Sequence, residues 1–159
     1  MRLLQPIKLG NTTLKNSIAM APMTRSRAST EGIVGESTKL YYSQRSSAGL
    51  IISEAINISE QSIGSPLTPG LYNLEQILAW KEITQVVHNN GGTIYAQLCH
   101  TGRVGHSLVK NGKLPVAPSA IQIVGQKHFT MEGPKDYETP KELSTTEIDT
   151  IIDEYKQAA

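Results

Sequence analysis

Hydrophobic residues gather in three short runs that alternate poorly with polar residues. The runs cover Ser17–Met23, Leu50–Ala55 and Thr93–Leu98. Strands that are buried on both faces, as in a parallel sheet, have this nearly continuous apolar pattern. The sequence therefore predicts three strands of one parallel sheet.

A helical pattern follows each of the three runs. Glu36–Ala48 offers apolar side chains for packing, and Gly49 is placed to end that helix. Asn73 is a suitable cap for a helix through Asn90, in which apolar residues recur at steps of three and four. We therefore expect a helix between the first two strands and another between the second and the third.

The third helix has the clearest start. Ser144 and Glu147 have the spacing of a capping box, in which each side chain bonds the backbone N–H of the other. Apolar residues then line one face at helical spacing; they are Ile148, Ile151, Ile152 and Tyr155. The pattern predicts a helix that continues to the last residues.

Two segments lie outside this alternation of strands and helices. Ile7–Leu14 has the pattern of a hairpin that turns at Gly10-Asn11. Residues 101–142 form a long connection with four prolines, and a second hairpin is expected around Ile121–Phe129. Connections of this length are usually binding loops or lids.

The fold class predicted is α/β of the TIM-barrel type. Three successive strand–helix units imply a parallel sheet with right-handed crossovers. A closed barrel needs eight such units and typically about 250 residues, whereas this chain has 159. We therefore expect residues 1–159 to be a single domain that holds the first three units of an incomplete (β/α)8 barrel.

Composition and charge narrow the class of function. Apolar residues make up 38% of the chain, and 15 basic residues nearly balance 14 acidic ones. No basic run offers a site for nucleic acid. The single cysteine, Cys99, allows no internal disulfide, and no apolar stretch reaches the roughly 20 residues of a membrane span. We expect a cytoplasmic protein that associates with neither nucleic acid nor membrane.

Polar residues follow each predicted strand at its carboxyl end, where parallel α/β folds bind ligands. Thr24 and Arg25 follow the first strand, Glu54 lies at the end of the second, and Gln97 to Arg103 closes the third. A hydroxyl, an amide and two guanidinium groups would then share one rim. In the alternative interpretation, Thr24 and Gln97 merely satisfy loop backbone groups.

Five strings of residues then identify a family. They are 21–25 (APMTR), 41–45 (YYSQR), 48–55 (AGLIISEA), 69–72 (PGLY) and 96–103 (AQLCHTGR), and in this order and spacing the chain resembles the Old Yellow Enzyme family. The resemblance implies an FMN-dependent ene reductase on a TIM barrel. NADPH or NADH would reduce the flavin, and the flavin would reduce the C=C bond of a small α,β-unsaturated carbonyl compound.

The resemblance also implies cofactor-binding residues. Backbone groups of Pro22 and Met23 would touch the isoalloxazine ring, and the Thr24 hydroxyl would donate to its O4 and N5 edge. Ala55 would leave room at the pyrimidine end, where the Gln97 amide complements N3–H and O2.

The family pattern places the remaining functional groups after residue 159. The His/His or His/Asn pair that holds the substrate, the tyrosine proton donor and the phosphate loops would all come later, so no catalytic residue is assigned within this chain. We expect the isolated chain to be inactive, to bind FMN weakly and to associate with itself through open barrel edges. The alternative is a truncated, non-catalytic chain that acts only by assembly with another polypeptide.

Other polar residues have structural interpretations. Glu54 is expected to bond backbone at the strand end. Cys99 and His100 are adjacent on a strand and would point to opposite sides, which makes a metal site improbable; Cys99 either packs or reshapes the substrate pocket. The remaining candidates are expected to pack or to brace loops, or have no assigned role; they are Tyr41, Tyr42, Arg25, Arg103, His106 and His128.

Overall fold

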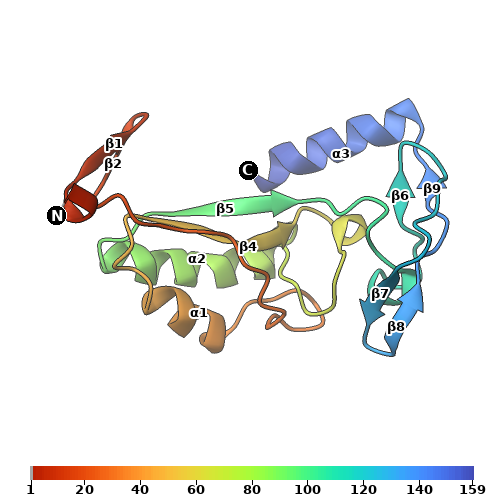
Figure 1. The fold of residues 1–159 in the computed structure, drawn as a ribbon, viewed down its shortest axis with the longest axis horizontal. Helices are drawn as coiled ribbons and strands as arrows, with labels where there is room; N and C mark the ends of the chain where they lie inside the picture. The colour runs from red at the N-terminus through yellow and green to blue at the C-terminus, as the bar shows by residue number, and fades with distance from the viewer. Residues whose placement is uncertain (1) are drawn as a thin grey trace.

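The computed structural model describes residues 2–159, and its centre is a three-stranded parallel sheet (Figure 1). The strands are β3 (Ala19–Met20), β4 (Leu50–Asn57) and β5 (Ile94–Cys99), in the order β3-β4-β5. All three predicted strands and their parallel pairing are confirmed. The first is only two residues long, because Pro22 has no N–H with which to continue the ladder.

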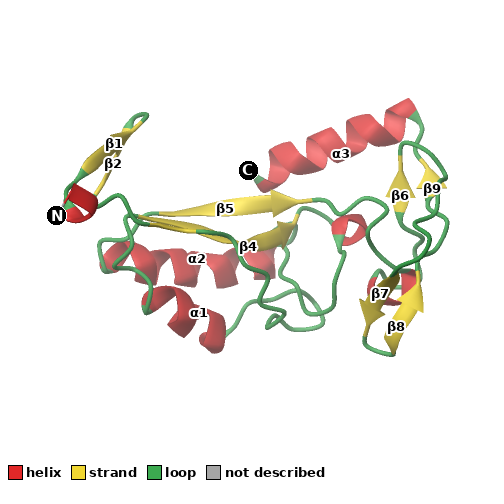
Figure 2. Cartoon of the chain, in the orientation of Figure 1, coloured by secondary structure: helices red, strands yellow, loops and turns green. Residues whose placement is uncertain are grey.

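Two helices, α1 (Glu36–Ser43) and α2 (Leu74–Asn89), lie on the same side of the sheet (Figure 2). The Asn73 side chain caps α2 by accepting from the backbone N–H of Gln76 across 2.9 Å, as its position predicts. Buried side chains from both helices and from β4 form the core, among them Tyr42, Ile51, Ile56, Trp80, Ile83 and Val87.

Gly49 does not end a helix, contrary to the prediction. The helix α1 already ends at Ser43, and residues 44–48 continue in tight turns, such as the one closed by Arg45 N–H donating to the Tyr42 carbonyl. A side chain at Gly49 would overlap the carbonyl of Asn16. The glycine therefore allows two backbone segments to approach each other at the start of β4.

The third helix, α3 (Thr145–Ala158), begins with the predicted capping box. The Ser144 hydroxyl accepts from Glu147 N–H across 3.3 Å, and the Glu147 carboxylate accepts from Ser144 N–H across 2.9 Å. In Figure 1, α3 runs back above β5, whereas α1 and α2 lie below β4.

The amino-terminal hairpin is confirmed. After a 3-10 helix, η1 (Arg2–Leu4), the strands β1 (Ile7–Leu9) and β2 (Thr12–Leu14) pair antiparallel, with Gly10 at φ +57° in the turn. The hairpin stands at one end of the molecule (Figure 1), and the Thr12 hydroxyl lies 3.3 Å from the Tyr95 hydroxyl.

Residues 101–142, called the excursion below, leave the sheet and return to α3. They contain the 3-10 helix η3 (Ser107–Val109) and the strands β6 (Val116–Ala117), β7 (Lys127–Thr130), β8 (Gly133–Asp136) and β9 (Lys141–Glu142). The predicted hairpin lies later than residues 121–129, because Gly133 at φ +93° closes the turn after β7. The parallel pair β6–β9 was not predicted.

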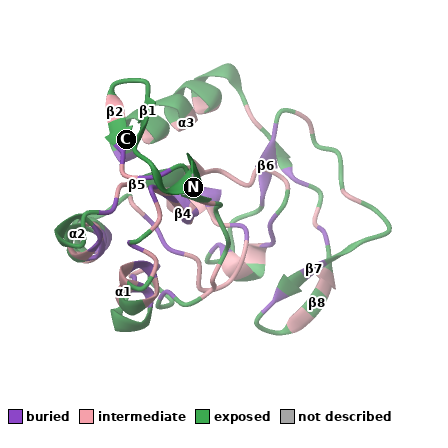
Figure 3. Cartoon of the chain, turned by 60° about the vertical axis from the view of Figure 1, so that its left-hand side comes forward, coloured by how far each residue is buried: buried purple, intermediate pink, exposed green. Residues whose placement is uncertain are grey.

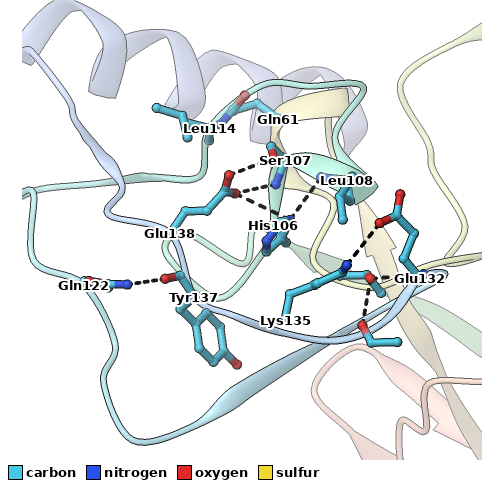
Figure 4. A network of polar contacts seen from close by, with 12 residues as sticks. Gln61, His106, Ser107, Leu108, Leu114, Gln122, Glu132, Lys135, Tyr137 and Glu138 are labelled. Carbon is cyan, nitrogen blue, oxygen red and sulfur yellow. Dashed lines mark hydrogen bonds and ion pairs between the residues drawn. The ribbon is translucent and has the colours of Figure 1, made fainter.

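Polar contacts attach the excursion to the 3-10 helix η2 (Glu60–Ser62), which follows β4. Lys110 donates to the Gln61 carbonyl, and the Gln61 amide donates to the Leu114 carbonyl across 2.8 Å. Within the excursion, the Glu138 carboxylate accepts from the N–H and hydroxyl of Ser107 (Figure 4). Buried residues accordingly occur in the excursion as well as in the sheet (Figure 3).

Candidate functional site

The carboxyl ends of the strands bring the predicted site residues into one region. Ala55 on β4 and Gln97 on β5 are direct Cα partners in the parallel ladder. Thr24 follows β3 and directly precedes Arg25, whose backbone N–H donates to the Glu54 carboxylate across 3.2 Å. Thr24 is thus connected to Ala55 through Arg25 and Glu54, and Ala55 is the ladder partner of Gln97.

A β-bulge in β4 sets the direction of the side chains here. Ile52 pairs with Tyr95 and Ala55 with Gln97, so Ser53 and Glu54 together oppose the single residue Ala96. Both bulge residues are consequently buried, and the alternation along the strand changes phase after them. Ala55 then shares the less buried face of β4 with Ile52.

The Ser53 hydroxyl repairs the ladder at the bulge. It accepts from the backbone N–H of Gln97 across 3.0 Å and donates to the carbonyl of Glu54 across 2.7 Å. An extra residue normally leaves ladder groups unpaired. Here a buried side chain supplies the missing partners, so Gln97 stays fixed beside the bulge.

Glu54 is buried, with 2% of its surface exposed. Its backbone N–H donates to the Tyr42 hydroxyl across 2.8 Å, and that hydroxyl lies 3.5 Å from one carboxylate oxygen. Burial raises the pKa of the Glu54 carboxyl, while the backbone N–H and positive charge of Arg25 and the Tyr42 hydroxyl act in the opposite direction. The prediction that Glu54 bonds backbone at the strand end is confirmed.

The side chains predicted to face a cofactor are open to a ligand. Pro22, Met23, Thr24 and Gln97 are exposed, and Ala55 is half-buried. The backbone N–H of Gln97 is held by the Ser53 hydroxyl, and the exposed Thr24 hydroxyl and Gln97 amide are accessible to a ligand. This arrangement suits a flat ligand with donors and acceptors along its edge.

Cys99 and His100 lie at the end of β5 beside a buried lysine. Burial raises the pKa of the Cys99 thiol and lowers the pKa of His100 to about 4. His100 Nδ1 accepts from Gly102 N–H across 3.0 Å. Within residues 2–159 there is no group of three or more His, Cys, Asp or Glu that would hold a metal ion.

Lys110 was missed from the sequence. It is fully buried, and burial lowers the pKa of its amine to about 8 although the nearby Cys99 acts against that shift. A lone lysine in a polar loop gives no signal of burial, because most lysines are exposed. The structure makes it an anchor of the excursion on η2 rather than a surface charge.

The tyrosines pack as predicted, whereas the Arg25 side chain stacks on a ring where a loop-bracing hydrogen bond was expected. The Arg25 and Arg45 guanidinium groups lie 3.3 and 3.6 Å from the centre of the Tyr41 ring, and Tyr42 is wholly buried. Arg103 braces a loop by donating to the Ile121 carbonyl across 3.2 Å.

The two histidines of the excursion pack together. His106 and His128 stack with ring centres 6.5 Å apart, and His106 Nδ1 accepts from Leu108 N–H. Both rings are buried, and burial lowers the pKa of His128. Their place is inside the excursion, away from the ends of β3 and β4.

A cavity of about 500 Å³ lies away from Thr24, Ala55 and Gln97. It is formed by α3, the excursion and Gln61, and its apolar lining consists of Leu114, Val116, Leu143 and Ile151. None of the predicted cofactor residues lines it.

In the described part of the chain, no helix has both the length and the apolar character needed to cross a bilayer.

Comparison with known proteins gives consistent matches along the whole described chain. The family described as NADH:flavin oxidoreductase / NADH oxidase matches residues 2–159. A chanoclavine-I aldehyde reductase of Penicillium roqueforti is 41% identical over 160 residues, which cover 99% of this chain and 42% of that protein.

Solved structures agree with this match. The old yellow enzyme homologue from Zymomonas mobilis superposes with a TM-score of 0.94 at 46% identity and covers 100% of this chain and 44% of its own. Morphinone reductase in complex with tetrahydroNAD gives a TM-score of 0.91 at 43% identity, and the match covers 98% of this chain and 44% of that one. The chain spans between 40% and 57% of the length of the curated relatives it matches.

Proposed function

The chain belongs to the NADH:flavin oxidoreductase / NADH oxidase family, and on that premise we propose that it supplies the flavin-ring side of the active site of an FMN-dependent ene reductase. The observation that carries this proposal is the position of Thr24, Ala55 and Gln97. The ladder and the Glu54 carboxylate hold them together, and the Thr24 and Gln97 side chains are exposed.

Each of these residues has a role that its chemistry supports. The Thr24 hydroxyl would donate to the O4 and N5 edge of bound FMN, where negative charge accumulates on reduction. The Gln97 amide offers an acceptor to N3–H and a donor to O2. Ala55 is small enough that the pyrimidine end could approach β4, and the exposed residues Pro22 and Met23 would border the ring.

FMN, when bound, supplies hydride transfer from NADPH or NADH to the C=C bond of an α,β-unsaturated carbonyl compound. The protein groups orient the ring and stabilise its reduced form. Reductases of organic substrates among the relatives, such as morphinone reductase and chanoclavine-I aldehyde reductase, support a small-molecule substrate. The proposal extends to a cytoplasmic enzyme with no nucleic-acid or membrane partner.

The sheet β3-β4-β5 corresponds in this proposal to the first three strands of a TIM barrel, in one domain. This chain covers only 44% of the length of each of the two solved structures compared with it. Residues 1–159 alone are therefore expected to bind FMN weakly and to be inactive. In residues 2–159, β3 and β5 are edge strands of the sheet. Open edges favour self-association, or assembly with another polypeptide as the alternative role of this chain.

The test is a titration of the isotopically labelled chain with FMN, followed by NMR of the backbone amides. Millimolar FMN should shift the amides of Thr24, Ala55 and Gln97, and lumiflavin, which has the ring without the phosphate, should shift the same set. Thr24→Val and Gln97→Leu should weaken these shifts, whereas Ser47→Ala, an exposed position away from the site, should not. Shifts confined to other residues would refute the site.

A further inference from the structure

Glu54 occupies a position from which it reaches two other elements. The bulge directs both Ser53 and Glu54 away from the face that carries Ala55, toward the helix layer. There the carboxylate lies between the Tyr42 hydroxyl of α1 and the Arg25 N–H of the loop after β3. One buried side chain therefore links α1, β4 and the segment that carries Thr24.

The carboxylate is one of three attachments that hold Arg25, and another is the Arg27 guanidinium group, which donates to the Arg25 carbonyl across 3.2 Å. The backbone N–H of Arg25 donates to Glu54, and the Arg25 guanidinium group stacks on Tyr41 at 3.3 Å from the ring centre. Thr24, the preceding residue, is exposed. The orientation of its hydroxyl thus depends on the backbone next to it, which the contacts of Arg25 hold in place.

The same interactions make Glu54 unsuitable as a proton donor to a ligand. It is buried on the helix side of the sheet, with both carboxylate oxygens facing protein donors. Hydrogen bonds to a charged acceptor are stronger than those to a neutral one. The carboxylate is therefore suited to holding backbone in place.

We propose that Glu54 is a positioning residue for the flavin: it fixes the Arg25 backbone and so aims the Thr24 hydroxyl at the O4 and N5 edge of the ring. The inference rests on the proposed function, since it assigns to Glu54 a role in binding the same cofactor. It goes beyond that function because Glu54 itself does not touch the ring.

The first measurement needs no flavin. Hydrogen exchange of the Arg25 amide in Glu54→Ala should be about tenfold faster than in the parent chain, as expected when a hydrogen bond to a charged group is lost. Glu54→Gln keeps an acceptor and should restore slow exchange. The control is Val87→Ala. This substitution creates a cavity at the buried face of α2 and lowers stability without changing a contact of Arg25.

The second measurement is a double-mutant cycle on the dissociation constant for FMN, from NMR titration. Thr24→Val should weaken binding about tenfold in the parent chain and in Val87→Ala, but hardly at all in Glu54→Ala, where the hydroxyl is no longer aimed. An equal loss from Thr24→Val in all three backgrounds would overturn the proposal.

The two measurements separate failure of this inference from failure of the proposed function. If Thr24→Val leaves FMN binding unchanged in the parent chain, the flavin contact of Thr24 is wrong, and with it the positioning role toward the ring. If Thr24→Val weakens binding but Arg25 exchange is the same in Glu54→Ala and Val87→Ala, the flavin site stands and Glu54 is only structural.

Discussion

The Ser53 hydroxyl accepts the backbone N–H of Gln97 across 3.0 Å, in the place of a ladder carbonyl. Because it also donates to the Glu54 carbonyl, one buried hydroxyl satisfies two backbone groups at the bulge. The bulge in turn determines which residues of β4 face the helices and which face the proposed ring.

Ser53→Ala should therefore lower the free energy of unfolding more than the substitution of an exposed serine does. It leaves a buried N–H without its acceptor, and we expect a loss of about 1–3 kcal/mol in the free energy of unfolding. Urea unfolding measures this loss, with Ser47→Ala as the matched control at an exposed position. A loss no larger than that of the control would show that the bulge does not depend on the hydroxyl.

Gly49→Ala should destabilise the junction between β3 and β4. The added methyl group would overlap the Asn16 carbonyl, which is backbone and cannot move aside as a side chain would. Overpacking of this kind costs about 1–3 kcal/mol. Thermal unfolding should show a lower midpoint, and an unchanged midpoint would mean that the two segments separate freely.

The buried amine of Lys110 should make stability depend on alkaline pH. Burial lowers its pKa from 10.5 to about 8, so between these values the unfolded chain binds more protons than the folded chain. The free energy of unfolding attributable to Lys110 should then rise with pH across this window, by up to about 3 kcal/mol.

The measurement for Lys110 is the free energy of unfolding in urea, determined from pH 7 to 10.5 for the chain with Lys110 and for Lys110→Met. The difference between the two values is compared across this pH range. Both proteins carry Cys99→Ala, which removes the opposite contribution of Cys99, whose raised pKa lowers stability above pH 9. A difference that does not change with pH would show that the amine is hydrated in the folded chain.

Ser144→Ala should weaken the start of α3. The substitution removes the hydroxyl that accepts from Glu147 N–H, and loss of such a cap costs about 1 kcal/mol. Hydrogen bonds from Lys141, and after it from the backbone and hydroxyl of Ser144, lower the pKa of Glu147 to about 2, so that pKa should rise when the hydroxyl is removed. NMR measures the two effects: the chemical shifts of the first turn of α3 report on its helicity, and a pH titration gives the pKa of Glu147. The exposed Thr146→Ala is the control.

Strong local patterns predicted most of the fold. Three apolar runs, the cap at Asn73, the capping box at Ser144 and the turn at Gly10 were confirmed, because each is encoded by neighbouring residues. The pair β6–β9 was not foreseen, since two residues in each strand carry no periodicity.

The site was predictable only as a set of residue types at strand ends. Which face of β4 carries Ala55 depends on the bulge. The change in side-chain alternation at the bulge cannot be recognised in a sequence run that is apolar throughout. The burial of Lys110 and the close approach at Gly49 depend on segments distant in sequence, so neither has a local signal.

The parallel pair β6–β9 closes the base of the excursion. Val116 lies beside Lys141 and Ala117 beside Glu142, so the chain returns to the point from which residues 118–140 depart. A loop with its ends clamped together tolerates exchange for sequences of other lengths. Residues 118–140 thus leave and re-enter the fold at one clamped point, so a change in their number should leave the spacing of β6 and β9 unchanged.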